Sequence, residues 1–433
     1  MARRFPAMLA PLIGLVRIEG HLNIREVVMR VVFRRSCGAV AFALLVLSPA
    51  SAQDTVRVRA DGPPKWGSGI RLVQEVAIGQ LDGPQEYAFG QVRSAVMDPR
   101  GGFYLYDFND RQIRRYDRTG RFLNLVGKKG GGPGEYEQMA GMAVTRDGQL
   151  IVHDTRNSRI TYFNPDGKVA REFPLLRRAF YVENFIVDTT GRIYLTVPLP
   201  GGPAEGAGSR HQYLRLTPDG AVIDSLLLPE ITVDRTGPNR GFFLNTSDGS
   251  RSSFMELPLR EFYPPGGHLY GSSHAYRFVV SRPGEPVLVV ERRYTPIPLG
   301  TEERAEWLAS ADWLEKNRPG GYKYVIARTK PPIRALMGDH LGRIWVDVFG
   351  PAEKRNDPPR PAGDARPQLT WKERTSYEVF SPFGAYLGRV NLPAETVGLA
   401  IRDNRLLARG KGPDGEDRIL VYRLETAEGR PVR

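Results

Sequence analysis

Two ungapped repeats of a strand-rich unit constrain this chain more than any other feature of its sequence. Residues 101–120 and 148–167 both begin with Gly, continue as a strand of alternating apolar residues, and end with Gly at the same offset. Asp107 in the first repeat aligns with Asp154 in the second. Strand-rich units that recur every roughly forty to fifty residues are typical of propellers and related arrays.

Both central strands of this unit recur six times. The second strand starts at Gly101, Gly148, Gly191, Gly267, Gly342 and, in degenerate form, Asn404. The third strand recurs independently and in the same order, at 114–120 and 161–167 and from Tyr213, Tyr276, Tyr377 and Ile419. The agreement of these two tallies predicts an all-β fold, a six-bladed β-propeller with four-stranded blades.

An N-terminal strand is expected to close the ring. The last unit supplies strands near 397–402, 404–409 and 418–424, after which the chain nearly ends. Residues 70–78 alternate like an outer strand but lack three preceding strands. Pairing this strand into the last blade would leave no long unpaired edge.

The first fifty-two residues have the pattern of an export signal. Arg34 and Arg35 precede the apolar stretch CGAVAFALLVLSP, which leads to an Ala-Ser-Ala cleavage motif before Gln53. We expect the coding sequence to start at Met29 and the mature, periplasmic or extracellular protein to carry no transmembrane anchor. The remaining chain is assigned as a linker (53–68), the propeller (69–425) and a tail (426–433).

Composition excludes several kinds of site. The single cysteine, Cys37, lies inside the signal, so the mature chain can form neither disulfides nor thiolate metal sites. Without residues 1–53 the chain keeps 54 basic and 46 acidic residues, a net charge of +8. Arg outnumbers Lys, as in GC-rich genomes, so this charge predicts no nucleic-acid partner. Acidic ligands and anionic envelope surfaces stay open as partners.

The stretch GKKGGGPGEYEQM, residues 127–139, has the composition of a phosphate-binding loop but not its order. A P-loop places its lysine after the glycines, at the start of a helix. Here Lys128 and Lys129 precede the glycine run, and the apolar residues 139–144 that follow predict a strand. We therefore expect a connection from the outer strand of one blade to the inner strand of the next, with glycines at positive φ.

Four consecutive motifs carry a resemblance to a known family. GGGPGEY precedes a predicted inner strand and is followed by DGQLIVHD, NSRITYF and a closing DG turn. This series resembles the NHL-type six-bladed propellers of secreted bacterial proteins, well over residues 80–195 and in degenerate form to residue 424. The resemblance implies the fold and leaves activity open, because propellers of this kind include lyases, lactonase-like hydrolases and binding modules.

Long inserts gather on one predicted face. Connections between second and third strands share a face with the crossings between blades, and these connections hold all four inserts, 197–212, 230–258, 296–332 and 350–375. We call this the insert face, and the opposite face, with short turns such as DRTG and NPDG, the turn face. Binding residues often lie on the loops of a rigid scaffold, so binding is predicted at the insert face. Insertions that accumulated in surface loops without any function would give the same pattern.

The insert 296–332 predicts a helix over residues 301–318, with Trp307, Ala311 and Leu314 packed onto the blades and Trp313 directed elsewhere. Aromatic and arginine side chains most often dominate binding energy at interfaces. The candidate contact residues on the insert face are Arg240, Phe242, Phe243, Trp313, Tyr322, Arg355 and Trp371. The competing interpretation for Trp313 is that its side chain packs in the core. For the arginines of the Pro-rich insert 350–375, it is that their charges only keep the segment solvated.

Catalytic and metal motifs are missing from the sequence. The histidines of the mature chain are scattered, without metal-ligand spacing, at His153, His211, His268, His274 and His340. The pairs Asp107/Asn109 and Asp154/Asn157 could direct oxygen atoms at a central calcium ion. We favour the interpretation that they bond their own turns. We predict no catalytic residue, metal ligand or cofactor. The alternative is a calcium ion bound by the Asp and Asn side chains.

These observations favour a monomeric extracytoplasmic propeller that binds a protein or small-molecule ligand of the cell envelope through the insert face. The alternative is a metal-dependent propeller lyase, or a lactonase- or esterase-like hydrolase, with its site at the mouth of the central channel.

Overall fold

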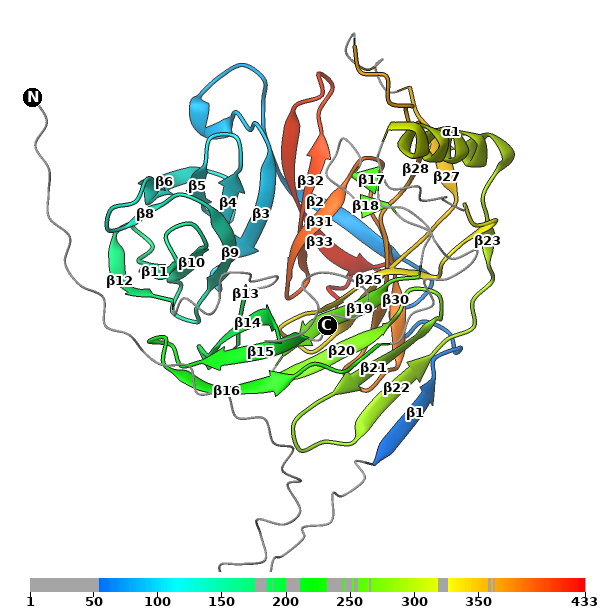
Figure 1. Ribbon diagram of the computed structural model, residues 1–433, viewed down its shortest axis with the longest axis horizontal. Helices are drawn as coiled ribbons and strands as arrows, with labels where there is room; N and C mark the ends of the chain where they lie inside the picture. The colour runs from blue at the N-terminus through cyan, green and yellow to red at the C-terminus, as the bar shows by residue number, and fades with distance from the viewer. Residues whose placement is uncertain are drawn as a thin grey trace, which may run out of the picture. The chain divides into compact units, whose positions relative to one another are not determined.

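Six antiparallel sheets form the ring of a β-propeller in the computed structural model, with one α-helix (Figure 1). This confirms the predicted six-bladed fold. The structure describes residues 54–175, 185–188, 190–199, 211–231, 244–245, 251–252, 256–264, 266–317, 326–356, 360 and 363–432. None of the helices in these ranges is both long and apolar enough to cross a lipid bilayer.

Each of the first three blades uses four consecutive strands, with the first strand innermost. Blade 1 contains β3 (Val92–Met97), β4 (Phe103–Asp107), β5 (Gln112–Tyr116) and β6 (Phe122–Val126). Blade 2 contains β9 (Met139–Val144), β10 (Leu150–Asp154), β11 (Arg159–Phe163) and β12 (Val169–Pro174). Blade 3 contains β13 (Phe185–Val187), β14 (Ile193–Pro198), β15 (His211–Leu216) and β16 (Val222–Leu227).

The last three blades differ in how they are completed at the rim. Blade 4 contains β19 (Pro258–Tyr263), β20 (Gly267–Ser272), β21 (Arg277–Ser281) and β22 (Val287–Glu291), with β1 (Thr55–Arg59) as a fifth strand. Blade 5 contains β25 (Ile333–Gly338), β26 (Ile344–Val348), β29 (Ser376–Phe380) and β30 (Tyr386–Asn391). Blade 6 contains β31 (Val397–Arg402), β32 (Arg405–Lys411), β33 (Asp417–Thr426) and β2 (Ile70–Ile78).

Strand β2 closes the ring as predicted. It pairs antiparallel with β33, from Ile70 opposite Thr426 to Ile78 opposite Ile419, with one bulge near Val76. The first and last long strands of the described chain therefore complete the same blade, and no blade is left short of its outer strand.

The segment before β2, which the sequence analysis assigned to a linker, runs along the rim. Strand β1 pairs in parallel with β22, so that Thr55 lies opposite Val287. The amides of Lys65 and Trp66 then donate to the carbonyls of Tyr386 and Leu387 at the start of β30. Residues 54–78 thus cover the outer edges of blades 4 and 5 and supply the outer strand of blade 6. Parallel pairing to a strand more than two hundred residues away leaves no local signal in the sequence.

Each seam between neighbouring blades holds a hydrophobic cluster, which explains why the strands are apolar on both faces. Among the described residues, the seam between blades 3 and 4 has the smallest cluster, made of Tyr194, Tyr213, Leu228 and Phe262. Three of these four side chains are aromatic. This seam is therefore the one most dependent on ring packing.

The remaining elements lie in the connections. They are the 3-10 helix Gln85–Tyr87, β7 (Lys128–Lys129), β8 (Glu135–Tyr136), β17 (Leu244–Asn245), β18 (Arg251–Ser252), β23 (Ile297–Pro298), α1 (Thr301–Asn317), β24 (Thr329–Lys330), β27 (Ala352–Lys354) and β28 (Trp371–Glu373). All four inserts fall between second and third strands or between blades. Because strands within a blade are antiparallel, these connections emerge on one face, which confirms the predicted insert face.

Candidate functional site

Two inserts join above blade 5 into one structure, which we call the cap. It consists of helix α1 and the hairpin β27–β28, which lie side by side in Figure 1. The Glu306 carboxylate on the helix accepts hydrogen bonds from the Thr370 amide at 2.6 Å and from its hydroxyl at 2.5 Å. Lys354 on the hairpin pairs with Glu302 at 2.8 Å. Two separate connections therefore fold as a unit.

The underside of the cap is apolar. Its cluster of buried residues is Leu299, Trp307, Ala311, Leu314, Ile326 and Phe349. The helix residues predicted to pack onto the blades are thus confirmed as buried. Trp313 packs partly buried against the same cluster, so its indole also contributes to holding the helix in place.

A buried network of charges ties the cap to blade 5. The ammonium group of Lys330, which has no solvent exposure, contacts Glu303 at 2.7 Å and Glu373 at 2.6 Å. Arg334 on the innermost strand pairs with Glu373 at 3.1 Å and with Asp347 at 3.2 Å. Burial raises the pKa of Asp347 above its ordinary value, while the positive charge of Arg334 opposes this shift. The network joins a helix, a hairpin and two blade strands, so the cap is built onto the propeller rather than tethered to it.

Three of the seven candidate contact residues lie in or beside the cap. Besides Trp313, Arg355 follows β27 and pairs with Glu395 at 2.9 Å, and Trp371 begins β28 with Lys354 5.9 Å from its ring centre. The structure therefore brings together three residues from two inserts. Arg240, Phe242, Phe243 and Tyr322 lie outside the described residues.

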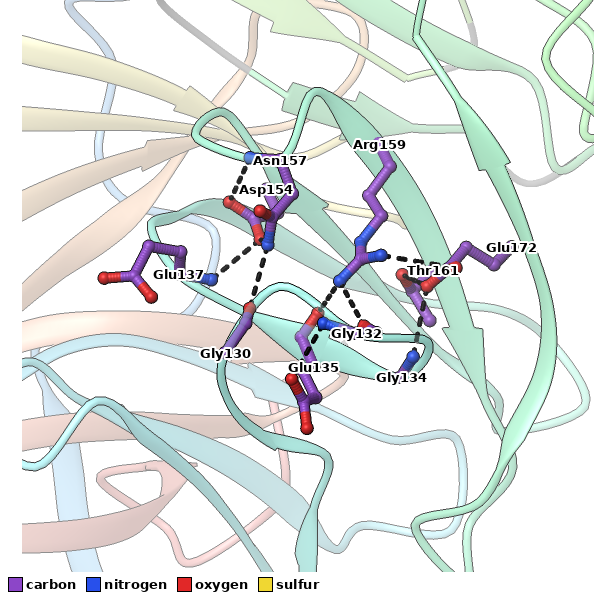
Figure 2. Close-up of polar contacts among 10 residues, drawn as sticks. All are labelled: Gly130, Gly132, Gly134, Glu135, Glu137, Asp154, Asn157, Arg159, Thr161 and Glu172. Atoms are coloured by element: carbon purple, nitrogen blue, oxygen red, sulfur yellow. Dashed lines mark hydrogen bonds and ion pairs between the residues drawn. The ribbon is translucent and has the colours of Figure 1, made fainter.

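The glycine-rich stretch crosses from β6 to β9, as predicted, and its polar groups are engaged within the protein (Figure 2). Glu135 accepts the Gly132 amide at 2.8 Å and pairs with Lys128 at 3.2 Å. Arg159 donates to the Gly132 carbonyl at 2.6 Å. A side chain at Gly130, where φ is +152°, would collide with the Glu135 carboxylate. The charges of Glu135 and Lys128 are thus paired within the loop itself.

The repeated aspartates act as clamps between turns and crossings. The Asp154 carboxylate accepts the Glu137 amide in the crossing at 2.8 Å (Figure 2). It also accepts the amides of Gln138 in the crossing and of Arg156 in its own turn, both at 3.0 Å. Asp107 repeats the pattern in blade 1 with the amides of Gly90, Gln91 and Asn109. Both aspartates thus bond a backbone amide of their own turn, as expected, and in addition two amides of the segment that leads into the blade.

The innermost strand of blade 4 carries an acid that the sequence analysis missed. Glu261 on β19 is partly exposed, and its only hydrogen bond within the described structure comes from the Phe262 amide, at 3.1 Å. Burial raises the pKa of this carboxyl group to about 7, with the amide bond opposing the shift. Two adjacent charged residues, Arg260 and Glu261, stand between Leu259 and Phe262 in this strand, and they were the available signal.

Tyr213 lies near this acid in the seam between blades 3 and 4. Its side chain is 3% exposed, and within the described part of the chain its hydroxyl group makes no hydrogen bond. Burial and the charge of Glu261 raise its pKa, and Arg260 lowers it. The Tyr213 ring stacks on His268, with ring centres 5.2 Å apart, and burial lowers the pKa of that histidine. A carboxyl group that titrates near neutrality can exchange a proton with a bound molecule.

Two other histidines, His153 and His340, lie at separate places in the propeller. His153 is buried in the seam between blades 2 and 3, where it stacks on Phe185 and burial lowers its pKa to about 4. His340 on the turn face lies 3.0 Å from Asp403. Within the described ranges, no three residues of the metal-binding types His, Cys, Asp and Glu form a group suited to a metal ion.

One comparison with known proteins bears on the architecture. The DUF5128 family model, described as a 6-bladed β-propeller, matches residues 80–187. No curated protein matches the sequence. A DUF4221 family member from Bacteroides vulgatus is 11% identical, with a TM-score of 0.49, over 83% of this chain and 99% of its own.

Two enzymes are also among the similar structures. Virginiamycin B lyase from Staphylococcus aureus is 10% identical, with a TM-score of 0.40, over 82% of this chain and 99% of its own. A gluconolactonase from Xanthomonas campestris is 15% identical, with a TM-score of 0.36, over 77% of this chain and 87% of its own. At these identities and scores the likenesses say nothing about activity.

Proposed function

We propose that this propeller is an extracytoplasmic binding module that contacts its ligand or partner through the insert face, around the cap. The observation that carries the proposal is the construction of the cap. Two inserts that are separate in sequence form one structure, held by a buried apolar cluster and by a charge network in which Lys330 is fully enclosed. Loops that drift without function have no need for such shared support.

On the turn face, in contrast to the cap, aspartate side chains bond the backbone of their own turns. The Asp117 carboxylate accepts the amides of Thr119 and Arg121 in its own turn, and Asp188 and Asp339 repeat this pattern. Hydrogen bonds from Thr119 hold the pKa of Asp117 well below its usual range. Side chains committed to their own turns offer few groups to a partner.

Substitutions on the two faces test the proposal. Mature protein is used to capture partners from a cell-envelope extract, and binding is then measured with the captured partner. Arg355→Ala and Trp371→Ala should weaken binding at least about tenfold, a loss typical of interface residues, and leave the melting temperature nearly unchanged. Asp117→Ala and Asn164→Ala should lower the melting temperature and spare binding. Loss of binding with the turn-face pair alone would refute the assignment of the face.

Glu261 supports a second candidate function, catalysis at the channel. Its carboxyl group, on an innermost strand and with a pKa near 7, has the properties of a general acid or base. Esterase and lactonase turnover of the purified protein should then follow a pH profile with an inflection near 7 that Glu261→Gln abolishes. A metal-dependent reaction would in addition lose activity with EDTA and recover it with calcium or zinc. Absence of turnover in both tests would leave the binding module as the sole proposal.

A further inference from the structure

The outer strand of blade 3, β16, lacks a contact that covers the outer strands of other blades. In four blades the glycine that ends the turn before the outer strand lies against the outer strand of the preceding blade. These contacts are Gly120 on β2, Gly167 on β6, Gly220 on β12 and Gly384 on β22. In blade 4 the glycine of this turn, Gly284, comes one residue earlier, and a Cβ there would meet no atom within 4 Å apart from its neighbours in the chain. The glycine contact is therefore missing at β16.

The side chains of β16 are apolar and exposed. Ile223 is 43% exposed and Leu227 51%, and Ser225 between them is exposed as well. The single charged residue of the strand, Asp224, accepts a hydrogen bond from Arg215 of the neighbouring strand β15 at 2.8 Å, so its charge is neutralised within the blade. The strand contains neither a lysine nor a proline. It thus lacks the residues that usually prevent an edge strand from pairing with another chain.

The outer strands of blades 1 and 2 have such protection. In blade 2, β12 carries Arg171 and Glu172 and ends at Pro174, which has no amide hydrogen to donate. In blade 1, the side-chain amide of Asn124 donates to the Leu125 carbonyl at 2.9 Å and occupies part of the backbone of β6. Among these three outer strands, β16 is therefore the one suited to pair with a further strand.

The backbone of β16 presents a regular row of hydrogen-bonding groups along its outer edge. The Leu228 amide donates to the His211 carbonyl at 2.9 Å, in register with the pairing of β15 and β16. In an antiparallel pair, Leu228 and every second residue before it then direct their amide and carbonyl groups toward β15. The residues between them, Ile223, Ser225 and Leu227, direct theirs outward. Within the described part of the chain, no strand pairs with this side of β16.

Blade 4 shows that an outer strand of this propeller can accept a fifth strand. There β1 pairs along the outer edge of β22. The sequence of β16 is suited to take a second copy of itself in the same place. In an antiparallel pair of two β16 strands centred on Ser225, Ile223 lies opposite Leu227 of the second copy, and each Ser225 lies opposite the other. Apolar residues then face apolar residues, and the outward backbone groups of both strands meet.

We infer that β16 joins two copies of this chain into a dimer with two-fold symmetry, in which the sheets of the two blades 3 become one continuous sheet. Identical strands that pair antiparallel form such an interface, because each residue of one copy meets the same partner in the other. A single pair of strands buries less than the roughly 800 Å² per partner of a stable interface, so the dimer should dissociate on dilution. This inference goes beyond the proposed function, which concerns the insert face, and it replaces the monomer expected from the sequence.

Sedimentation velocity of the mature chain tests the inference. The unmodified protein should change from monomer to dimer as its concentration rises from about 1 µM to about 200 µM. Ser225→Pro removes the central outward amide and no hydrogen bond within the blade, so it should raise the dissociation constant of the dimer at least about tenfold. Leu227→Lys places a charge on the same edge and should have a similar effect. Both variants should keep the melting temperature of the monomer nearly unchanged.

Disulfide cross-linking tests the symmetry of the pair. Residues 53–433 contain no cysteine, so an introduced thiol can only link two copies. Opposite residues in a hydrogen-bonded antiparallel pair have Cα atoms about 5.5 Å apart, a distance that a disulfide spans. Ser225→Cys should therefore give a covalent dimer under mild oxidation. The matched control, Leu125→Cys on the outer strand of blade 1, is at a position of similar exposure, 45%, and should stay monomeric.

Three results would overturn the inference. The first is an unmodified protein that stays monomeric over the whole concentration range. The second is a dimer that Ser225→Pro and Leu227→Lys both leave intact, because another surface would then join the copies. The third is cross-linking of the Leu125→Cys variant as fast as that of the Ser225→Cys variant, because the link would then report random collisions.

Discussion

At the scale of single residues, Lys330 and Glu261 show two different environments for an ionisable side chain. Lys330 lies between two carboxylates and a backbone carbonyl, so its three donors are all satisfied. Glu261 has one amide donor and no cation partner within the described structure. A buried charge with a structural role needs hydrogen-bond partners for all its donors or acceptors. An acid on an innermost strand that lacks such partners costs stability, and it is therefore a candidate for a functional role.

The Glu261 carboxyl group should make stability depend on pH. Its pKa is about 7 in the folded protein, above its ordinary value of 4.5, so the folded state binds the proton more tightly. The free energy of unfolding should therefore fall as the pH rises from about 4.5 to 7 and stay lower above 7. The interval sets an upper limit of roughly 3 kcal/mol, and partial solvent access should reduce this to about 1–2 kcal/mol.

Urea unfolding at pH 5 and pH 8 measures this effect. Glu261→Gln should remove most of the Glu261 contribution, while Glu230→Gln, at an exposed position, should preserve it. Equal pH dependence in the Glu261 variant and the unmodified protein would show that this carboxyl group titrates normally.

At the scale of elements, the cap depends on one buried lysine. Removing one partner from a buried charge network leaves the others uncompensated, which typically costs 3–5 kcal/mol. Lys330→Met should therefore lower the free energy of unfolding by about 3 kcal/mol, because Glu303 and Glu373 both lose their cation.

The exposed pair of Lys354 and Glu302 supplies the control. Both side chains are more than half exposed, so Lys354→Met should leave the free energy of unfolding nearly unchanged. Chemical denaturation of the two variants separates the cases. Equal stability of the two would mean that the charge network does not hold the cap.

The elements that the sequence analysis predicted are those with a local or repeated signal. Blade count, ring closure by residues 70–78 and the helix at 301–317 follow from alternation, turn residues and capping. Strand β1 was missed because its partner, β22, is remote and parallel. The union of two inserts into the cap was also missed, since contacts such as Glu306 with Thr370 join residues without any shared pattern. Glu261 was missed because the burial that raises its pKa depends on how the blades pack together.

At the scale of the whole molecule, the segment 54–78 has two separable roles. Strand β2 completes blade 6, whereas β1 and Trp66 add to blades 4 and 5, which already have four strands each. A chain that starts at Gly69 should therefore keep a closed ring, although it loses the buried side chains of Ala60 and Trp66. A chain that starts at Gln80 should expose the edge of β33 and lose stability and solubility sharply.

Thermal unfolding of the two truncated chains distinguishes these roles. The melting temperature should fall by more than about 10 °C when β2 is removed as well, and by less on removal of residues 54–68 alone. If the melting temperatures of both truncated chains fell by similar amounts, ring closure would depend on the whole segment 54–78 and not on β2 alone.

Closure by β2 has a consequence for the order in which the protein can mature. Arg71 of β2 bonds Glu425 of β33, a residue that follows it by 354 positions. In synthesis from the N-terminus β2 is made long before β33, so β2 has no partner until the chain has been made as far as β33. Any chain interrupted before β33 keeps two open edges, which proteases and chaperones recognise. Closure of the ring therefore requires a chain that extends through β33.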